Sequence, residues 1–182
     1  TTLEFKITNT SPIVRIPLVK GSLLNHPTAN IEVDWGDGSA VSAYSFSDNT
    51  TVELLFHKYD TIPGNNIVTV KIYGGWGWSG KFGFCKFDER PEGHTMNKLY
   101  KVKSQENFWI HGQGDFKDCT ELVSLNNVWG KFVKDQNQKF ELIDTFAGCS
   151  ALVSGLGSWK LDGCTKLEGV LKGTQVYQEW IR

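Results

Sequence analysis

Apolar and polar residues alternate through the first part of the chain, which is the pattern of half-buried β-strands. The clearest case is Ile31–Ser39, where every second residue up to Trp35 is apolar and Asp37-Gly38 offers the chemistry of a tight hairpin turn. Further segments with strand character are Leu3–Ile7, Ile13–Val19, Ala40–Phe46, Thr51–Phe56 and Ile67–Tyr73. Six or seven short strands, spaced about ten residues apart and divided by Gly, Pro and Asn, predict a β-sandwich.

The pattern changes beyond Gly80 from alternation to an internal repeat. The segment Phe116–Ser124, FKDCTELVS, returns thirty residues later as Phe146–Ser154, FAGCSALVS, and a degenerate third copy lies in Cys164–Thr174. Upstream, Lys98–Trp109 has the character of an entry unit. A unit of this length cannot bury its own apolar face, so we predict a short stacked solenoid. Each copy is expected to hold a turn near its phenylalanine and a strand near its Leu-Val-Ser.

A glycine-rich stretch, Gly74–Gly80, separates these two patterns and contains Trp76 and Trp78. The predicted domains are therefore a β-sandwich over residues 1–75 and a repeat segment with a C-terminal cap over residues 76–182. The two tryptophans either pack at the junction, which we favour because large aromatics usually serve packing, or form an exposed platform for sugars or a partner. The amphipathic end of the chain either caps the last repeat or docks on a neighbouring subunit.

Composition narrows the class of protein. The chain has 182 residues, of which 40% are apolar, so it can bury a substantial core. Its net charge is −1 with both signs mixed along the sequence, which disfavours a nucleic-acid or anionic-membrane surface. There is no run of apolar residues long enough to span a bilayer, and no signal peptide is expected within the sequence, although a leader could have been removed.

The cysteines do not have the spacing of a metal site. They are Cys85, Cys119, Cys149 and Cys164, and no two of them form a CxxC pair. The repeat places Cys119 and Cys149 on neighbouring units, roughly one strand spacing of 4.7 to 4.9 Å apart. A disulfide would fit that distance, but we favour free buried thiols. Sequons at Asn9 and Asn49 lie in polar stretches and are candidate glycosylation sites.

The first half resembles a known family. Val33–Ser39 reads VDWGDGS and His57–Gly74 reads HKYDTIPGNNIVTVKIYG, and this pair is similar to the signature of the polycystic-kidney-disease (PKD) type of immunoglobulin-like domain. The chain departs from that signature at Asn66-Ile67, where an aromatic residue is usual, and in a longer turn after Tyr59. Both departures lie in a loop or at the start of a strand, so the expected fold is unchanged.

The hairpin residues have structural roles that follow from their chemistry. We expect Trp35 to fill the space between two sheets, and Asp37 to hydrogen-bond its own turn. Tyr59 is expected to act as a tyrosine corner, and His57 to bond a carboxylate or carbonyl of the hairpin. The structural hairpin set is Asp34, Trp35, Asp37, Gly38, His57 and Tyr59. A calcium site at the two aspartates is the alternative, although two carboxylates are far short of a full ligand set.

The second half resembles another family. The motif F-x-x-C-x-x-L with a following Trp, at Trp129 and Trp159, is similar to the leucine-rich repeats of BspA-like surface proteins. The resemblance extends from about Leu3 to Thr174, because a WGDG-bearing β-domain precedes such repeats in that family. It departs from the family's W-D-T-S-N-V-T-N-M run, which is represented here only by Trp159–Leu167. The resemblance implies a secreted or cell-surface protein that binds other surface or matrix proteins, without catalysis or cofactors.

Three functions from different classes follow. The leading hypothesis is a non-catalytic adhesion or protein-interaction module, the second is a carbohydrate-binding module with exposed tryptophans, and the third is a structural subunit that self-associates into a filament or layer. The candidate binding residues are Trp76, Trp78, Trp109 and His111. An enzyme is not expected, because the four histidines, His57 included, are scattered and no acid–base pair or nucleophile accompanies them.

Overall fold

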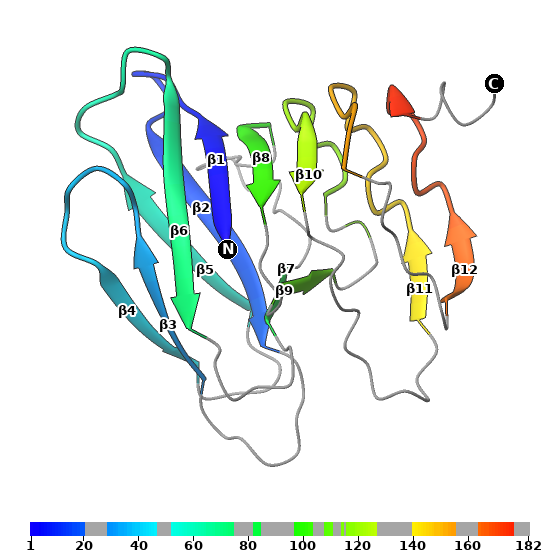
Figure 1. Cartoon of the computed structure of the whole chain (residues 1–182), viewed down its shortest axis with the longest axis horizontal. Helices are drawn as coiled ribbons and strands as arrows, with labels where there is room; N and C mark the ends of the chain where they lie inside the picture. The colour runs from blue at the N-terminus through cyan, green and yellow to red at the C-terminus, as the bar shows by residue number, and fades with distance from the viewer. Residues whose placement is uncertain are drawn as a thin grey trace.

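The part of the chain that the computed structural model describes is mainly β, as the sequence predicts (Figure 1). The described residues are 1–20, 29–46, 52–74, 82–84, 97–103, 108–110, 114, 116–126, 140–155 and 164–176. Their strands are β1 (Thr2–Lys6), β2 (Ile13–Lys20), β3 (Ala29–Asp34), β4 (Ser42–Phe46), β5 (Val52–Lys58), β6 (Ile67–Gly74), β7 (Phe82–Phe84), β8 (Leu99–Lys103), β9 (Phe108–Ile110), β10 (Ser124–Asn126), β11 (Phe140–Ile143) and β12 (Cys164–Glu168).

The strands predicted in the first 75 residues are present as β1 to β6. Their alternation is the cause of their burial pattern. In β1, Leu3 and Phe5 are fully buried, whereas the side chains of Glu4 and Lys6 on the opposite face reach solvent. The inward residues of β3 and β6 follow the same period of two.

Two sheets enclose one hydrophobic core. The larger sheet has the strand order β10-β8-β1-β6-β3-β4, and the smaller one has the order β5-β2-β7-β9. In Figure 1, β2 and β5 lie behind β1 and β6. Buried side chains from both sheets belong to the same cluster, among them Phe5 and Val70 from the larger sheet and Val14, Ile16 and Leu55 from the smaller.

The larger sheet continues across the predicted boundary between residues 75 and 76. Strand β8 pairs antiparallel with β1, and β10 pairs parallel with β8. The predicted sandwich and the predicted repeat segment therefore share one sheet, with β1 hydrogen-bonded to β6 on one side and to β8 on the other.

From β7 onward strands also pair in parallel, and we call the successive stacked segments of the repeat rungs. The pairs β7 with β9, β8 with β10 and β11 with β12 are all parallel, and an isolated parallel bridge joins Ser124 to Ser154. Backbone hydrogen bonds connect successive turns at matching positions: Phe116 N–H donates to Thr145 O at 2.9 Å, and Phe146 N–H donates to Val170 O at 3.0 Å. The same bonds recur two residues to either side of each phenylalanine.

The predicted equivalence of Phe116 and Phe146 is confirmed. Both rings are fully buried, and they stack with centroids 5.3 Å apart and planes 9° from parallel. The predicted turn and strand of each copy are also present, although the strand begins at Ser124 in the first copy and is reduced to the bridge at Ser154 in the second. The predicted C-terminal cap beyond residue 176 lies outside the described residues.

The cysteines of neighbouring rungs are free thiols, as predicted. Cys119 and Cys149 are fully buried, and the Cys149 thiol donates to the Phe116 carbonyl at 2.9 Å. Burial raises the pKa of the Cys149 thiol to about 12 and raises the pKa of the Cys119 thiol well above its ordinary value. Both therefore act as small apolar core groups rather than as nucleophiles.

Candidate functional site

The WGDG hairpin between β3 and β4 is fixed by its two aspartates. The Asp34 carboxylate accepts a hydrogen bond from Gly36 N–H at 2.9 Å, and the Asp37 carboxylate accepts one from Ser39 N–H at 3.0 Å. Such contacts between a short acidic side chain and the backbone two residues on are the ordinary device of an Asx turn. The turn role predicted for both aspartates is present.

Residues at the end of β5 clamp this hairpin from the opposite sheet. His57 Nε2 lies 2.6 Å from Asp37 Oδ2, and the imidazole stacks on Trp35 with centroids 5.1 Å apart. The Tyr59 hydroxyl donates to the Trp35 carbonyl at 2.8 Å, and its ring meets His57 edge-on. Trp35 itself is 1% exposed, and its indole N–H donates to Ser42 Oγ at 3.2 Å. The contact predicted between His57 and a hairpin carboxylate is observed. Tyr59 bonds a backbone carbonyl, as predicted, but that carbonyl belongs to Trp35 in the hairpin rather than to a residue just upstream, and both contacts join the two sheets.

The charge distribution in this cluster keeps Asp37 ionised. Burial alone would raise the pKa of its carboxyl, but hydrogen bonds from the Ser39 side chain and backbone and the contact with His57 lower it to about 2. Burial raises the pKa of the Tyr59 phenol, and the negative charges of Asp37 and Asp34 raise it further. The phenol therefore stays a hydrogen-bond donor to Trp35.

This arrangement favours a structural role for the aspartates over a calcium site. Both oxygens of Asp37 already accept hydrogen bonds, one from Ser39 and one at His57. Within the described ranges, no three His, Cys, Asp or Glu side chains are grouped in a way that could hold a metal ion. An Asp–His pair is one part of acid–base chemistry, and the Tyr59 hydroxyl beside it is engaged in a hydrogen bond that it donates to the Trp35 carbonyl.

Acid should weaken the protein through Asp37. Its pKa is lower in the folded state than its ordinary 3.8, so its contribution is complete above about pH 5 and declines as the pH falls toward 2. Because Asp37 is an exposed residue, solvent screening reduces the effect of this pKa shift, and we expect a loss of about 1 kcal/mol of unfolding free energy over that range, measured by urea unfolding at successive pH values. Asp37→Asn should be less stable at neutral pH and should lack this part of the acid slope. Asp60→Asn, at an exposed position, is the control; an unchanged slope in Asp37→Asn would contradict the assignment.

The remaining predicted site residues are only partly placed. Trp76, Trp78 and His111 lie outside the described residues, as does the sequon at Asn49. The backbone of Trp109 lies in β9, which pairs with β7 in the smaller sheet. The sequon residue Asn9 is exposed in the turn between β1 and β2, a position that an attached glycan could occupy.

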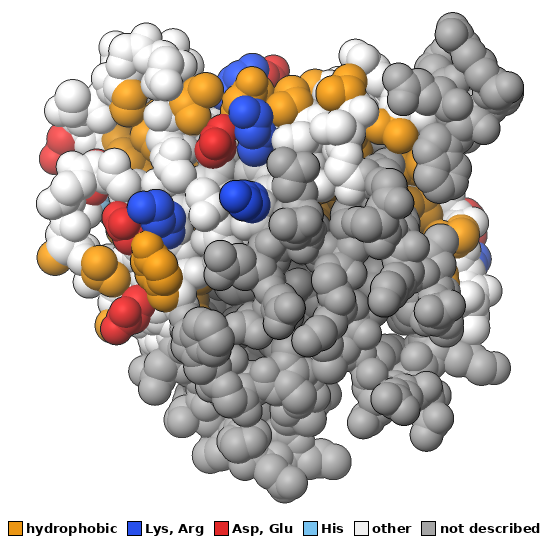
Figure 2. Space-filling model, in the orientation of Figure 1, with side chains coloured by type: hydrophobic (Ala, Val, Ile, Leu, Met, Phe, Trp, Pro, Cys, Tyr) orange, Lys and Arg blue, Asp and Glu red, His pale blue; other side chains and the backbone are white. Residues whose placement is uncertain are grey.

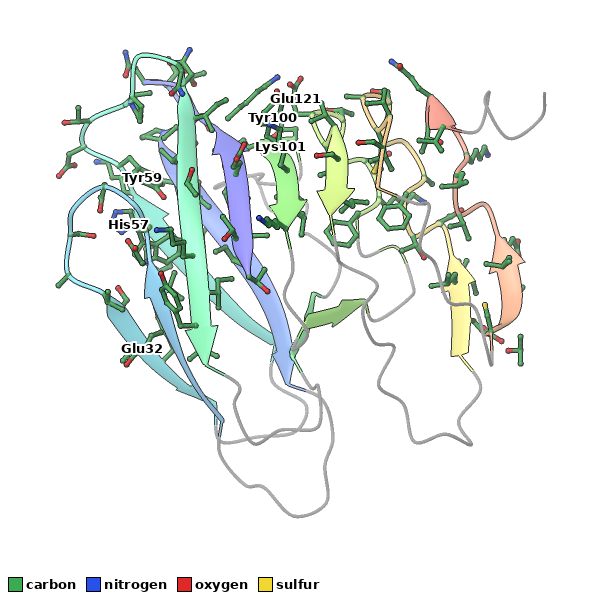
Figure 3. The ribbon with its side chains drawn as sticks, viewed as in Figure 1. Glu32, His57, Tyr59, Tyr100, Lys101 and Glu121 are labelled. Carbon is green, nitrogen blue, oxygen red and sulfur yellow. The ribbon has the colours of Figure 1, made fainter. Side chains whose placement is uncertain are left out.

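A second cluster, missed by the sequence analysis, lies on the outer face where β1 meets β8. We call it the junction cluster, and its members are Glu4, Lys6, Tyr100, Lys101 and Glu121 (Figure 3). Lys6 Nζ lies 2.6 Å from Glu121 Oε2, and Lys101 Nζ lies 3.7 Å from Glu4 Oε2. Both ammonium groups also lie over the Tyr100 ring, at 4.6 and 5.0 Å from its centroid. The half-buried ring therefore has two ammonium groups over it, each paired with a carboxylate.

A β-bulge places the tyrosine there. In the pairing of β1 with β8 the register shifts between Glu4 and Phe5, so that Tyr100 and Lys101 both stand opposite the same stretch of β1. The buried residues on either side, Leu99 and Val102, are three apart rather than two. That broken period is visible in the sequence and could have signalled the bulge.

Opposite charges alternate over this outer face (Figure 2). Strand register sets Asp34 of β3 opposite Lys71 of β6, and Glu4 of β1 opposite Lys101 of β8. Such cross-strand pairs stabilise a sheet modestly and leave little excess charge of either sign. The described part of this face therefore carries both signs of charge around Tyr100.

No residue that the structure describes lies in a helix long and apolar enough to cross a bilayer. Comparisons with protein-family models, with curated protein sequences and with solved structures found no match to this chain.

Proposed function

We propose that this chain is a non-catalytic interaction module of the cell surface or the extracellular space. In this proposal a PKD-like β-sandwich and a short BspA-like leucine-rich-repeat solenoid form one rigid unit, and the outer face of the larger sheet binds partner proteins. The observation that carries the proposal is the junction cluster, which gathers residues from β1, from β8 and from the turn before β10 around one tyrosine.

Three features of that cluster support recognition. Tyrosine offers a large contact area with few rotatable bonds, and it is enriched at the centre of protein interfaces. The lysines over Tyr100 are already paired with carboxylates, so the ring is held in place before any partner arrives. The bulge interrupts the alternation of side chains in β8. Tyr100 therefore lies on the same face as the charged residues that flank it.

Immobilised extracellular-matrix proteins provide the test. We expect the full chain to bind at least one member of such a panel, and Tyr100→Ala to weaken that binding about tenfold or more, as truncation of a central aromatic residue does. Phe56→Ala removes an exposed aromatic ring from the other sheet and should leave binding unchanged. Thermal unfolding of both variants checks that the fold is intact.

Two results would count against the proposal. Equal loss of binding in the Tyr100 and Phe56 variants would place the contact elsewhere, and failure to bind any matrix protein would remove the adhesion role. Binding to a glycan array that depends on Trp76 and Trp78 would favour the carbohydrate-binding alternative instead.

A further inference from the structure

The last described strand of the parallel stack is β12. Among the described residues β12 pairs with β11 alone, in a two-stranded sheet, and it lies at the far end of the molecule from β4 (Figure 1). An edge strand presents a row of backbone donors and acceptors that another strand can bind. The question is which strand fits this edge.

Burial shows that β12 lacks the cover that its neighbour has. Leu142 of β11 and Leu167 of β12 are register partners, so both side chains point to the same face of the sheet. Leu142 is fully buried, whereas Leu167 is 56% exposed. Among the described residues, Leu167 therefore lacks the cover that Leu142 has.

The backbone N–H and C=O groups of Leu167 point away from β11. The Glu168 carbonyl accepts a hydrogen bond from Asp144 N–H at 2.8 Å, so Glu168 directs its peptide groups toward the preceding rung. Successive residues in a strand direct their peptide groups to opposite sides. The N–H and C=O of Leu167 consequently lie on the open edge.

The charged residues beside Leu167 would face opposite charges if the strand paired antiparallel with the same strand of a second copy. Lys166 and Glu168 flank it, pair with each other at 2.7 Å, and are 49% and 63% exposed. We propose that β12 pairs antiparallel with β12 of a second copy about a two-fold axis at Leu167. In that register the two leucines exchange both backbone hydrogen bonds, and each Lys166 stands opposite the Glu168 of the other copy.

The architecture favours this closed dimer over an open filament of stacked repeats. A filament of stacked repeats would add the β12 edge to the upstream end of the next stack, and there β8 is already hydrogen-bonded to β1. The outer edge of the larger sheet is β4, which lies outside the repeat stack. An edge that meets its own copy forms an isologous contact, which closes after two chains. The inference does not depend on the proposed function, because β12 shares no residue with the junction cluster.

Charge substitution tests the register. Sedimentation of the full chain over a concentration series should show its mass rising toward that of two chains. Lys166→Glu and Glu168→Lys each place two pairs of like charges across the axis, and each should weaken dimerisation about tenfold or more. An equimolar mixture of the two variants restores opposite charges in both pairs, so it should form a heterodimer with approximately the affinity of the native chain. The double variant K166E/E168K should also dimerise with itself.

Lys103→Glu is the matched control, since it reverses an exposed lysine on a strand of the larger sheet and should not alter dimerisation. A chain that stays monomeric up to millimolar concentration would overturn the proposal. So would a dimer whose affinity is unchanged in both single variants, or a mixture of the two that fails to associate. Binding to matrix proteins by a chain that remains monomeric would preserve the proposed function while removing this inference.

Discussion

Replacing Phe146 by alanine should lower the free energy of unfolding by about 3 to 5 kcal/mol. The ring is fully buried and stacks on Phe116 of the preceding rung, so its removal leaves a cavity that the stacked backbone cannot easily close. Phe116→Ala should cost a similar amount, because the two rings occupy equivalent positions. The double variant should reveal a coupling of about 0.5 to 1.5 kcal/mol, the range found for aromatic pairs.

Chemical unfolding followed by tryptophan fluorescence and circular dichroism measures these differences. Phe56→Ala is the matched control: it makes the same chemical change at a side chain that is 59% exposed and that lies under the Arg15 guanidinium. We expect that variant to lose no more than about 1 kcal/mol. A Phe146 variant no less stable than the Phe56 variant would show that the repeat turns do not share a packed core.

Local patterns were sufficient to predict the strands and the repeat. Alternation depends only on neighbouring residues, so β1 and β6 could be recognised from their apolar periods. The repeat could be recognised because stacked rungs reuse the same side chain at the same place, as with Phe116 and Phe146. His57 could be assigned a partner because its chemistry suits the hairpin that precedes it, whereas the bond from Tyr59 to the Trp35 carbonyl could not be foreseen.

Long-range pairing was beyond the reach of those patterns. Nothing in the order of residues indicates that β8 adds to β1, since strand order depends on which edges remain open once the core has formed. The junction cluster follows from that pairing and was therefore missed. Lys98 is a similar case. Lysine side chains are ordinarily exposed, yet Lys98 is 7% exposed, and its ammonium donates a hydrogen bond to the Ile13 carbonyl at 2.7 Å. Burial and the nearby Arg15 lower the pKa of that ammonium.

The second large loss of stability is expected from substituting a glycine of the WGDG hairpin. The hairpin has two glycines with positive φ, and they differ in the space that a Cβ would find around it. Gly36 and Gly38 both have positive φ, of 77° and 84°, so alanine is strained at either position by about 1 kcal/mol. A Cβ on Gly38 would meet nothing within 4 Å, whereas a Cβ on Gly36 would lie 2.2 Å from the Thr69 carbonyl oxygen. Thr69 belongs to β6, which is hydrogen-bonded to β1 and β3. Neither the hairpin backbone nor the β6 backbone can therefore move away without breaking hydrogen bonds of the sheet.

Gly36→Ala should therefore destabilise the protein by about 4 kcal/mol or more, a loss typical of overpacking combined with backbone strain. Gly38→Ala should lower the free energy of unfolding only by the strain of alanine at positive φ, about 1 kcal/mol. The comparison is made by chemical unfolding of both variants, with the Asp37–His57 contact followed through the imidazole resonances in NMR spectra. Displacement of the hairpin from β6 would shift those resonances in the Gly36 variant and leave them close to native in the Gly38 variant. Equal stability of the two variants would mean that Gly36 does not lie against the Thr69 carbonyl of β6, which would contradict the prediction.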